Sequence, residues 1–311
     1  MITRRTKTRR NRRKYLYNNW DLYAMLAIPV VYIIVFKYVP MYGVQMAFRN
    51  FNIFKGMYNS PFVGFKHFET FIGSTEFTRL VGNTLTLSVY GLVAGLIFPI
   101  VLALMLNYIG NTRFKKVVQT ITYAPYFIST TVMVSIILQF LAREYGPINS
   151  FLKSMGLQQI DFLSNAKIFP HVYVWSGIWQ YTGYNSIIYI ATLSGIDVEL
   201  HEAAIVDGAT KWRRIWSIDL PGIRPTIVIL LIMNMGSILS TGFEKIYLMQ
   251  NNLNLSASEV IDTYVYKIGL ASPIANYSYP TAIGLFQSFI GMLLIIAANA
   301  LARRVSESSL W

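Results

Sequence analysis

The chain has 311 residues, of which 54% are hydrophobic and only 13% are charged, whereas a soluble domain is about one quarter charged. This composition indicates a membrane protein. The chain has no cysteine, which excludes a disulfide framework and cysteine nucleophiles, and its three scattered histidines leave little for a metal site, so we expect none.

The positive charge is concentrated at the beginning of the chain. The formal net charge is +13, and eight of the 27 basic residues lie in the first 14 positions, directly before an apolar run. Such a segment is typical of a cytoplasmic tail that contacts anionic lipids. We expect lipid rather than nucleic acid as its partner, because no aromatic-interleaved RNA motif accompanies it. Residues 1–21 are predicted to form this basic cytoplasmic tail.

Six segments are long and apolar enough to cross a bilayer, which takes about 20 residues. In chain order they are Leu22–Val39, Val81–Leu106, Val117–Leu141, Tyr173–Leu193, Pro225–Phe243 and Ala282–Leu301. Six crossings place both termini on one side. With the N-terminus inside, the inner segments beyond the tail hold nine Lys and Arg in 51 residues, and the outer segments hold nine in 110. The positive-inside rule therefore predicts that both termini are cytoplasmic.

A charged, helix-forming segment separates the fourth and fifth spans. Asp197 can cap a helix over Val198–Val206, and Gly208 can close it in the left-handed conformation. Thr210 can cap a second short helix over Lys211–Ile218, before Leu220-Pro221. We expect two short helices within residues 197–218, with a sharp turn between them, on the cytoplasmic face. From the residues alone, a docking surface for a partner and an interfacial amphipathic helix both remain open.

The pattern Glu202-Ala203-Ala204-x-x-Asp207-Gly208-Ala209, followed by Ile218-x-Leu220-Pro221-x-x-x-Pro225, resembles the EAA loop of the inner-membrane permeases of bacterial ABC importers. One departure is Ile215, where many members carry an aromatic residue. Other segments resemble carbohydrate-importer permeases of the maltose and glycerol-phosphate type, and more narrowly LplB-type permeases for oligosaccharides derived from polysaccharides; they include Gly82-Asn-Thr-Leu85, Gly146-Pro-Ile-Asn149, Glu259–Tyr266 and Tyr279–Gln287.

The resemblance implies an all-α type I ABC importer permease with six transmembrane helices in the bacterial cytoplasmic membrane. It implies a first helix and outer loop over 22–80, a permease core over 81–302 and a cytoplasmic tail over 303–311. The EAA loop would dock on the ATPase through Glu202, Ala203, Ala204, Asp207, Gly208, Ala209, Trp212 and Pro221.

The resemblance also implies partners: a second homologous permease subunit, two ATP-binding subunits and an extracytoplasmic, lipoprotein-type solute-binding protein. The chain has no GxxxxGK[ST] sequence, so we expect it to bind no cofactor itself and to leave ATP and Mg to the ATPase subunits. We therefore expect a transport subunit rather than an enzyme. A self-sufficient secondary transporter or channel is the alternative, but the spans lack the midplane ionisable residues that it favours.

Sugar sites combine aromatic faces with amide and hydroxyl groups. The candidates for an oligosaccharide pathway are Trp179, Gln180, Tyr184, Asn185, Asn234 and Gln287. For the tryptophans and tyrosines an interfacial belt is the competing interpretation. The outer loop 244–278 is expected to dip toward the cavity or to meet the binding protein, unless it is an ordinary surface loop.

Overall fold

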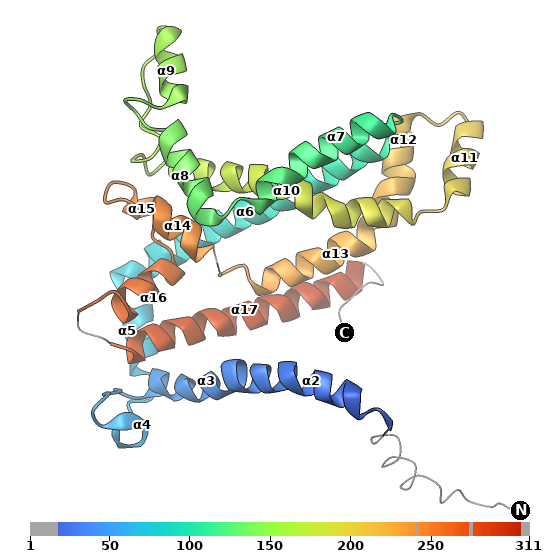
Figure 1. Ribbon diagram of the computed structural model, residues 1–311. Helices are drawn as coiled ribbons and strands as arrows, with labels where there is room; N and C mark the ends of the chain where they lie inside the picture. Colours follow the sequence, from blue (N-terminus) through green and yellow to red (C-terminus); the bar gives the residue numbers. More distant parts are fainter. Residues whose placement is uncertain (1–17, 241, 274–275, 306–311) are drawn as a thin grey trace, which may run out of the picture.

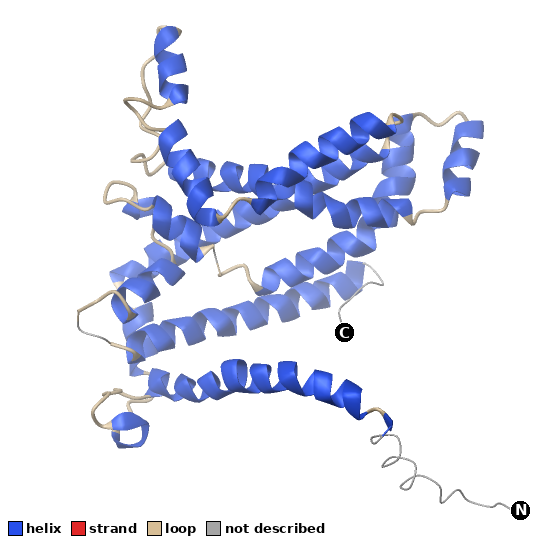
Figure 2. Cartoon of the chain, in the orientation of Figure 1, coloured by secondary structure: helices blue, strands red, loops and turns tan. Residues whose placement is uncertain are grey.

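The computed structural model describes residues 18–240, 242–273 and 276–305, and in this part of the chain helices are joined by loops, with no β-strand (Figure 2). Most of the predicted basic tail, and the predicted C-terminal tail beyond residue 305, lie outside the described residues.

The first helical segment is a separate arm along one side of the molecule (Figure 1). It consists of α2 (Trp20–Ile33), a π turn (Ile34–Tyr38), α3 (Val39–Met41) and a 3₁₀ segment (Tyr42–Phe48). No side chain of α2 is buried within this chain, and the 3₁₀ segment packs on the last helix. Two short helices, α4 (Gly56–Asn59) and α5 (Lys66–Ile72), follow.

Four long helices form the body of the molecule. The 33-residue α6 (Thr75–Asn107) packs along the 26-residue α10 (Phe169–Ser194), and α13 (Leu220–Gly236) packs along α17 (Ser278–Val305). Their contacts bury clusters of apolar side chains, one of which contains Ala103, Tyr189, Leu193 and Ile223.

The third predicted span is not one straight helix. α7 (Thr112–Tyr123) leads into a 3₁₀ turn (Ala124–Phe127), and α8 (Thr130–Phe140) continues at an angle of 100°. Pro125 cannot donate the backbone hydrogen bond that a continuous helix requires. Ser129 caps α8 by accepting a hydrogen bond from Val132 N, and Gln180 Nε2 donates to the freed carbonyl of Ile128 at 2.9 Å. Polar side chains thus form the hydrogen bonds that the backbone groups at the bend would otherwise lack.

Among the described residues, four helices have the length and composition of a membrane span, or five if the bent α7–α8 pair is counted as one. The predicted fourth span, α10, is long enough but falls outside this set, because its many polar residues lower its mean hydropathy. The fifth predicted span also differs, since its helix begins at Leu220 and ends at Gly236 rather than at Phe243.

The connecting helices gather at the two ends of the bundle. The start of α2 and the end of α17 lie at the same end of the bundle as α11 (Val198–Val206) and α12 (Lys211–Arg214) (Figure 1). The opposite end carries α4, α5, α9 (Pro147–Ser154), α14 (Phe243–Met249), α15 (Leu255–Ser258) and α16 (Ile261–Gly269).

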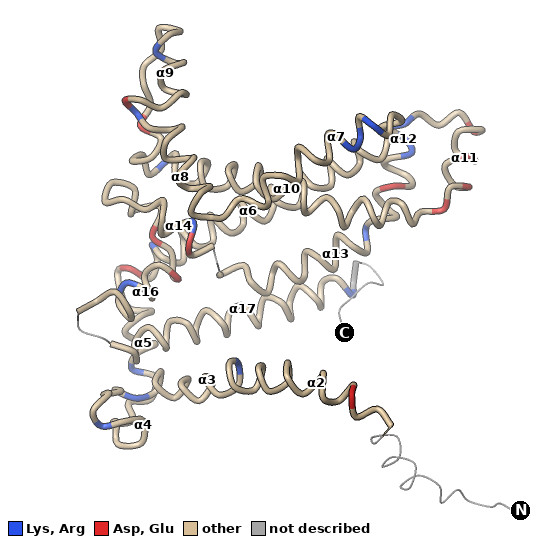
Figure 3. The backbone as a smooth tube through the Cα atoms, viewed as in Figure 1, with Lys and Arg blue, Asp and Glu red and all other residues tan. Residues whose placement is uncertain are grey.

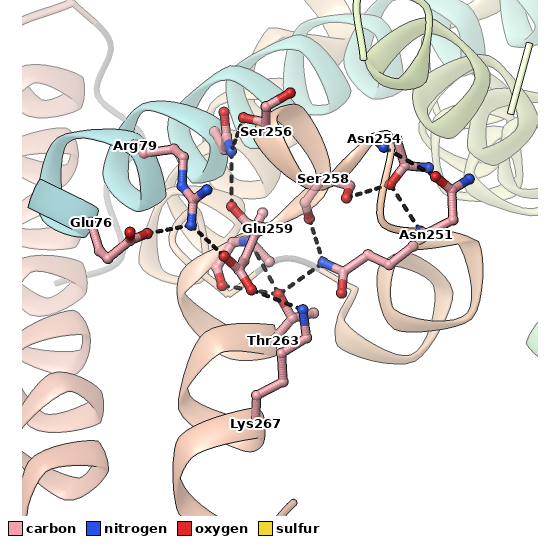
Figure 4. Close-up of polar contacts among 12 residues, drawn as sticks. Glu76, Arg79, Asn251, Asn254, Ser256, Ser258, Glu259, Thr263 and Lys267 are labelled. Atoms are coloured by element: carbon pink, nitrogen blue, oxygen red, sulfur yellow. Dashed lines mark hydrogen bonds and ion pairs between the residues drawn. The ribbon is translucent and has the colours of Figure 1, made fainter. Parts of the chain in front are cut away.

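At this opposite end, a polar network fixes the loop between α15 and α16 to α6 (Figure 4). The Glu259 carboxylate, only 8% exposed, accepts from Arg79 at 2.5 Å and from Lys267 at 2.8 Å. Asn83 Nδ2 donates to the Ser256 and Glu259 carbonyls, each at 2.9 Å. One buried carboxylate thus joins two cations from different helices, which holds the predicted outer loop against the bundle.

Candidate docking segment and translocation cavity

The helix predicted over Val198–Val206 is confirmed as α11, and its caps are those that the sequence indicates. Asp197 Oδ1 accepts a hydrogen bond from Glu199 N at 3.0 Å. At the other end, Gly208 has φ +76°, and Ala209 N donates to Ala204 O at 2.8 Å. This bond closes the helix in the manner of a Schellman motif, for which glycine is the favoured residue.

The second predicted helix of this segment is not a separate unit. Thr210 caps α12 as predicted, accepting from Arg213 N. A π turn over Ile215–Asp219 then joins α12 to α13 without a break, giving one helix over Lys211–Gly236. Pro221 lies in the first turn of α13. The wider π turn removes the clash between a proline ring and the preceding turn that ends an ordinary α-helix.

The predicted docking residues share one exposed surface at this end of the molecule. Six of them are exposed and two, Ala204 and Ala209, are half-buried; the exposed ones are Glu202, Ala203, Asp207, Gly208, Trp212 and Pro221. No side chain of α11 is buried, and Val206 and Trp212 are 87% and 72% exposed. Acidic residues lie along α11, and basic residues lie on α12 and at the start of α7 (Figure 3). An uncovered surface with mixed charge and large apolar groups is suited to a partner.

A buried carboxylate anchors this surface to the bundle. Asp219, with no exposed area, accepts a hydrogen bond from Tyr108 Oη at 2.7 Å and lies 3.5 Å from His201 Nε2 of α11. The Arg214 guanidinium lies 5.4 Å from the centre of the Tyr108 ring. Burial and the neighbouring Asp219 raise the pKa of Tyr108 to about 12, so the phenol remains a donor at neutral pH. Asp219 therefore links the end of α6 to α11 and α13.

Asp219→Ala is expected to destabilise the protein by about 1–3 kcal/mol, because it leaves the partly buried Tyr108 hydroxyl without its acceptor. Thermal unfolding of the purified protein in detergent measures the change. The double variant with Tyr108→Phe removes both partners, so its destabilisation should be less than the sum of the two single effects. Strictly additive effects would show that this hydrogen bond does not stabilise the fold.

A cavity of about 1020 Å³ lies between α6, α10, α13 and α14. Three of the predicted pathway residues line it, Tyr184, Asn185 and Asn234. The Tyr184 ring stacks on Tyr126 with 3.7 Å between centroids, and Asn234 Nδ2 donates to Leu230 O at 2.8 Å. The cavity wall is mainly aliphatic, and among its side chains are aromatic rings and amides, the groups that bind sugars.

The other three predicted pathway residues lie outside the cavity lining. Trp179 is exposed on the surface of α10. Gln180 is buried and donates to Ile128 O at the bend between α7 and α8. Gln287 Nε2 donates to the Leu239 carbonyl and to Asp262 Oδ1, at 2.5 and 2.9 Å. The hydrogen bonds of Gln180 and Gln287 join helices of this chain.

Sequence reasoning missed two charged groups in the cavity wall, Glu244 and Lys245, which lie in the first turn of α14. They directly follow the fifth predicted span, so the sequence places them in the outer loop. Lys245 is 7% exposed, and its ammonium donates to Tyr173 O at 3.0 Å. A charged pair directly after an apolar run was the available signal, but sequence does not show that α14 folds back on the cavity.

Long apolar helices surround a cavity whose wall carries a few polar side chains, and an exposed α11–α12 segment lies at one end of the bundle. This arrangement is that of a membrane permease. The chain matches the model of the family "Binding-protein-dependent transport system inner membrane component" over residues 95–307, and it belongs to this family. The predicted resemblance is thereby confirmed. The fold is that of a type I ABC importer permease, and a self-sufficient transporter or channel is not supported.

Two curated relatives from Bacillus subtilis (strain 168) match nearly the whole chain. Protein LplB is 42% identical over 93% of this chain and 91% of its own length. The polygalacturonan/rhamnogalacturonan transport system permease protein YteP is 39% identical over 93% and 90%.

Two solved structures have the same fold. Both are bacterial alginate ABC transporters, and one is in complex with an alginate pentasaccharide-bound periplasmic protein. The similar chain in that complex gives a TM-score of 0.87 at 38% identity, covering 96% of this chain and 99% of the other. In the other structure the TM-score is again 0.87 at 38% identity, over 94% and 98%.

Proposed function

We propose that this chain is the permease subunit of an ATP-driven importer, and that it passes an oligosaccharide delivered by an extracytoplasmic, lipoprotein-type solute-binding protein. The observation that carries the proposal is the similarity over nearly the whole chain to a permease of the alginate transporter with its loaded periplasmic protein. The named substrate of YteP, a polygalacturonan or rhamnogalacturonan, supports a sugar polymer as the source of the substrate.

We infer six crossings of the cytoplasmic membrane, formed by the α2–α3 arm, α6, the bent α7–α8 pair, α10, α13 and α17. Both termini and the α11–α12 segment would lie in the cytoplasm. The common position of the described chain ends and α11 supports this orientation (Figure 1), as does the higher density of basic residues in the inner segments. The polar residues of α10 are accommodated because this helix packs on α6 and lines the cavity.

The α11–α12 segment is the docking surface for a separate ATPase in this proposal. Glu202 and Asp207 would contact the ATPase, and the turn at Gly208 would fix the angle at which α11 enters a groove. ATP and Mg belong to two ATP-binding subunits, and a second homologous permease completes the membrane part. The uncovered apolar surfaces of α2 and α11 support contacts with lipid and with other subunits.

Reconstitution tests this function. Liposomes that hold this chain, the second permease, the ATPase subunits and the loaded binding protein are expected to take up oligosaccharide only with ATP inside. Liposomes that hold this chain alone should take up none. Uptake by the chain alone would contradict the proposal, as would an ATPase rate in the complete assembly that the loaded binding protein does not raise.

A further inference from the structure

Lys245 is a buried cation in the wall of the cavity. It is 7% exposed, and its ammonium lies 5.0 Å from the centre of the Tyr173 ring and donates to the Tyr173 carbonyl. The ammonium reaches α10 at Gly177, where an added Cβ would lie 3.4 Å from Nζ. Gly177 and Tyr173 both line the cavity, so the charge is held at the cavity surface.

No ion pair in the described part of the chain involves Lys245. The adjacent Glu244 accepts a hydrogen bond from Thr131 at 3.3 Å, and Asp262, an acid near Tyr173, accepts from Gln287 at 2.9 Å. A buried ammonium has three donors and normally has an anionic partner. One carbonyl and one ring face leave donor capacity for an anion from outside the chain.

The groups around Lys245 are those that bind sugars. Tyr181 and Tyr184 present aromatic rings, and Asn185 and Asn234 present amides in the same cavity. Among the described residues of the lining, Lys245 alone carries a positive charge. The cavity volume of about 1020 Å³ exceeds that of a typical small-molecule site, so several sugar units fit.

We propose that Lys245 binds a carboxylate of the passing sugar and makes the cavity selective for acidic, uronate-containing oligosaccharides. This inference rests on the proposed function, and it names the substrate class that the cavity admits. Burial lowers the pKa of Lys245 to about 8, and an arriving carboxylate raises it again, so sugar binding and protonation of Lys245 favour each other.

The position of Lys245 is suited to selecting acidic sugars where they enter the cavity. It lies in the first turn of α14, at the end of the bundle opposite α11, which is the extracytoplasmic end in the proposed orientation. Lys245 is the one cation of the described lining, and the adjacent Glu244 carboxylate in the same wall opposes its charge, so an acidic sugar is attracted without being held firmly. Because each bond is replaced easily, the sugar can move on toward Asn234.

Probe binding to the purified transporter tests the inference. The complete membrane assembly with its ATPase subunits is placed in nanodiscs without the binding protein, and fluorescent trigalacturonate is displaced with unlabelled trigalacturonate or with its fully methyl-esterified form. The wild type is expected to prefer the acid about tenfold. Lys245→Gln should remove this preference by weakening binding of the acid, whereas Lys245→Arg should retain it.

Lys153→Gln is the matched control, since Lys153 is an exposed lysine of α9 outside the cavity lining. Co-purification of the ATPase confirms that each variant assembles. Equal affinity of the wild type for acid and ester, an unchanged preference in Lys245→Gln, or the same loss in Lys153→Gln would each overturn the assignment. Uptake by the wild type separates the two proposals. A wild-type assembly that imports no sugar contradicts the proposed function. If the wild type imports sugar and Lys245→Gln still prefers the acid, only the role of Lys245 is contradicted.

Discussion

Gly208→Val is expected to lower sugar uptake by the reconstituted transporter at least tenfold and to abolish co-purification of the ATPase. Gly208 has φ +76°, where a residue other than glycine costs about 1–2 kcal/mol and a β-branched residue more. To relieve this strain, the turn must change, and the Ala209 N to Ala204 O bond that closes α11 is lost. α11 then no longer has the orientation that it needs to enter the groove of the ATPase in the proposed docking.

Gly208→Asn is the matched control, because asparagine tolerates the left-handed conformation. No heavy atom lies within 4 Å of a Cβ at this position, so a side chain by itself causes no clash. The Gly208→Asn variant should therefore support uptake near the wild-type rate. Charge reversal at Glu202 should also prevent docking without changing the turn. Normal ATPase co-purification with both Gly208→Val and Glu202→Lys would contradict the docking role of this segment.

Gly183→Ala is expected to destabilise the fold by more than about 3 kcal/mol, which makes it the largest single effect on stability that we expect. Gly183 lies where α10 crosses α7, and an added Cβ would lie 2.0 Å from the carbonyl oxygen of Thr122 and 2.4 Å from its carbonyl carbon. Because both atoms belong to the backbone, no side chain can rotate away. α7 has to move from α10, which also disrupts the bend before α8.

Gly284→Ala in α17 is the matched control, because it makes the same substitution in a helix without the steric clash. No heavy atom lies within 4 Å of a Cβ at Gly284, and alanine favours a helix interior over glycine by about 0.5–1 kcal/mol. Thermal unfolding in detergent should show an unchanged or raised midpoint for Gly284→Ala and a large decrease for Gly183→Ala. If Gly183→Ala unfolds at the wild-type temperature, the close crossing of α7 and α10 is not a feature of the folded protein.

Elements set by local chemistry were predictable. Asp197 and Gly208 mark the two ends of α11 because a capping carboxylate and a left-handed glycine act on their own helix. Thr210 marks the start of the next helix for the same reason. The long apolar runs likewise predicted α6 and α17, since a membrane-length helix is defined by its own composition.

Elements decided by contacts between distant residues were not predictable. Pro125 permits the bend between α7 and α8 locally, but the Ile128 carbonyl at the bend is satisfied by Gln180, which lies 52 positions away. The continuity of Lys211–Gly236 depends on a π turn whose Asp219 bonds to Tyr108, 111 positions away. Hydropathy alone gave no sign of either contact.

The sequence by itself determined an integral membrane protein, the bounds of α11 and the likeness to importer permeases, because composition, capping and a spaced motif are local properties. Only the tertiary structure decided which polar side chains face the cavity. Tyr184, Asn185 and Asn234 line it, while Gln180 and Gln287 bond within the bundle. Lys245 enters the wall because α14 folds back against α8 and places the ammonium over Gly177. Such placement depends on helix packing, which residue type and spacing do not specify.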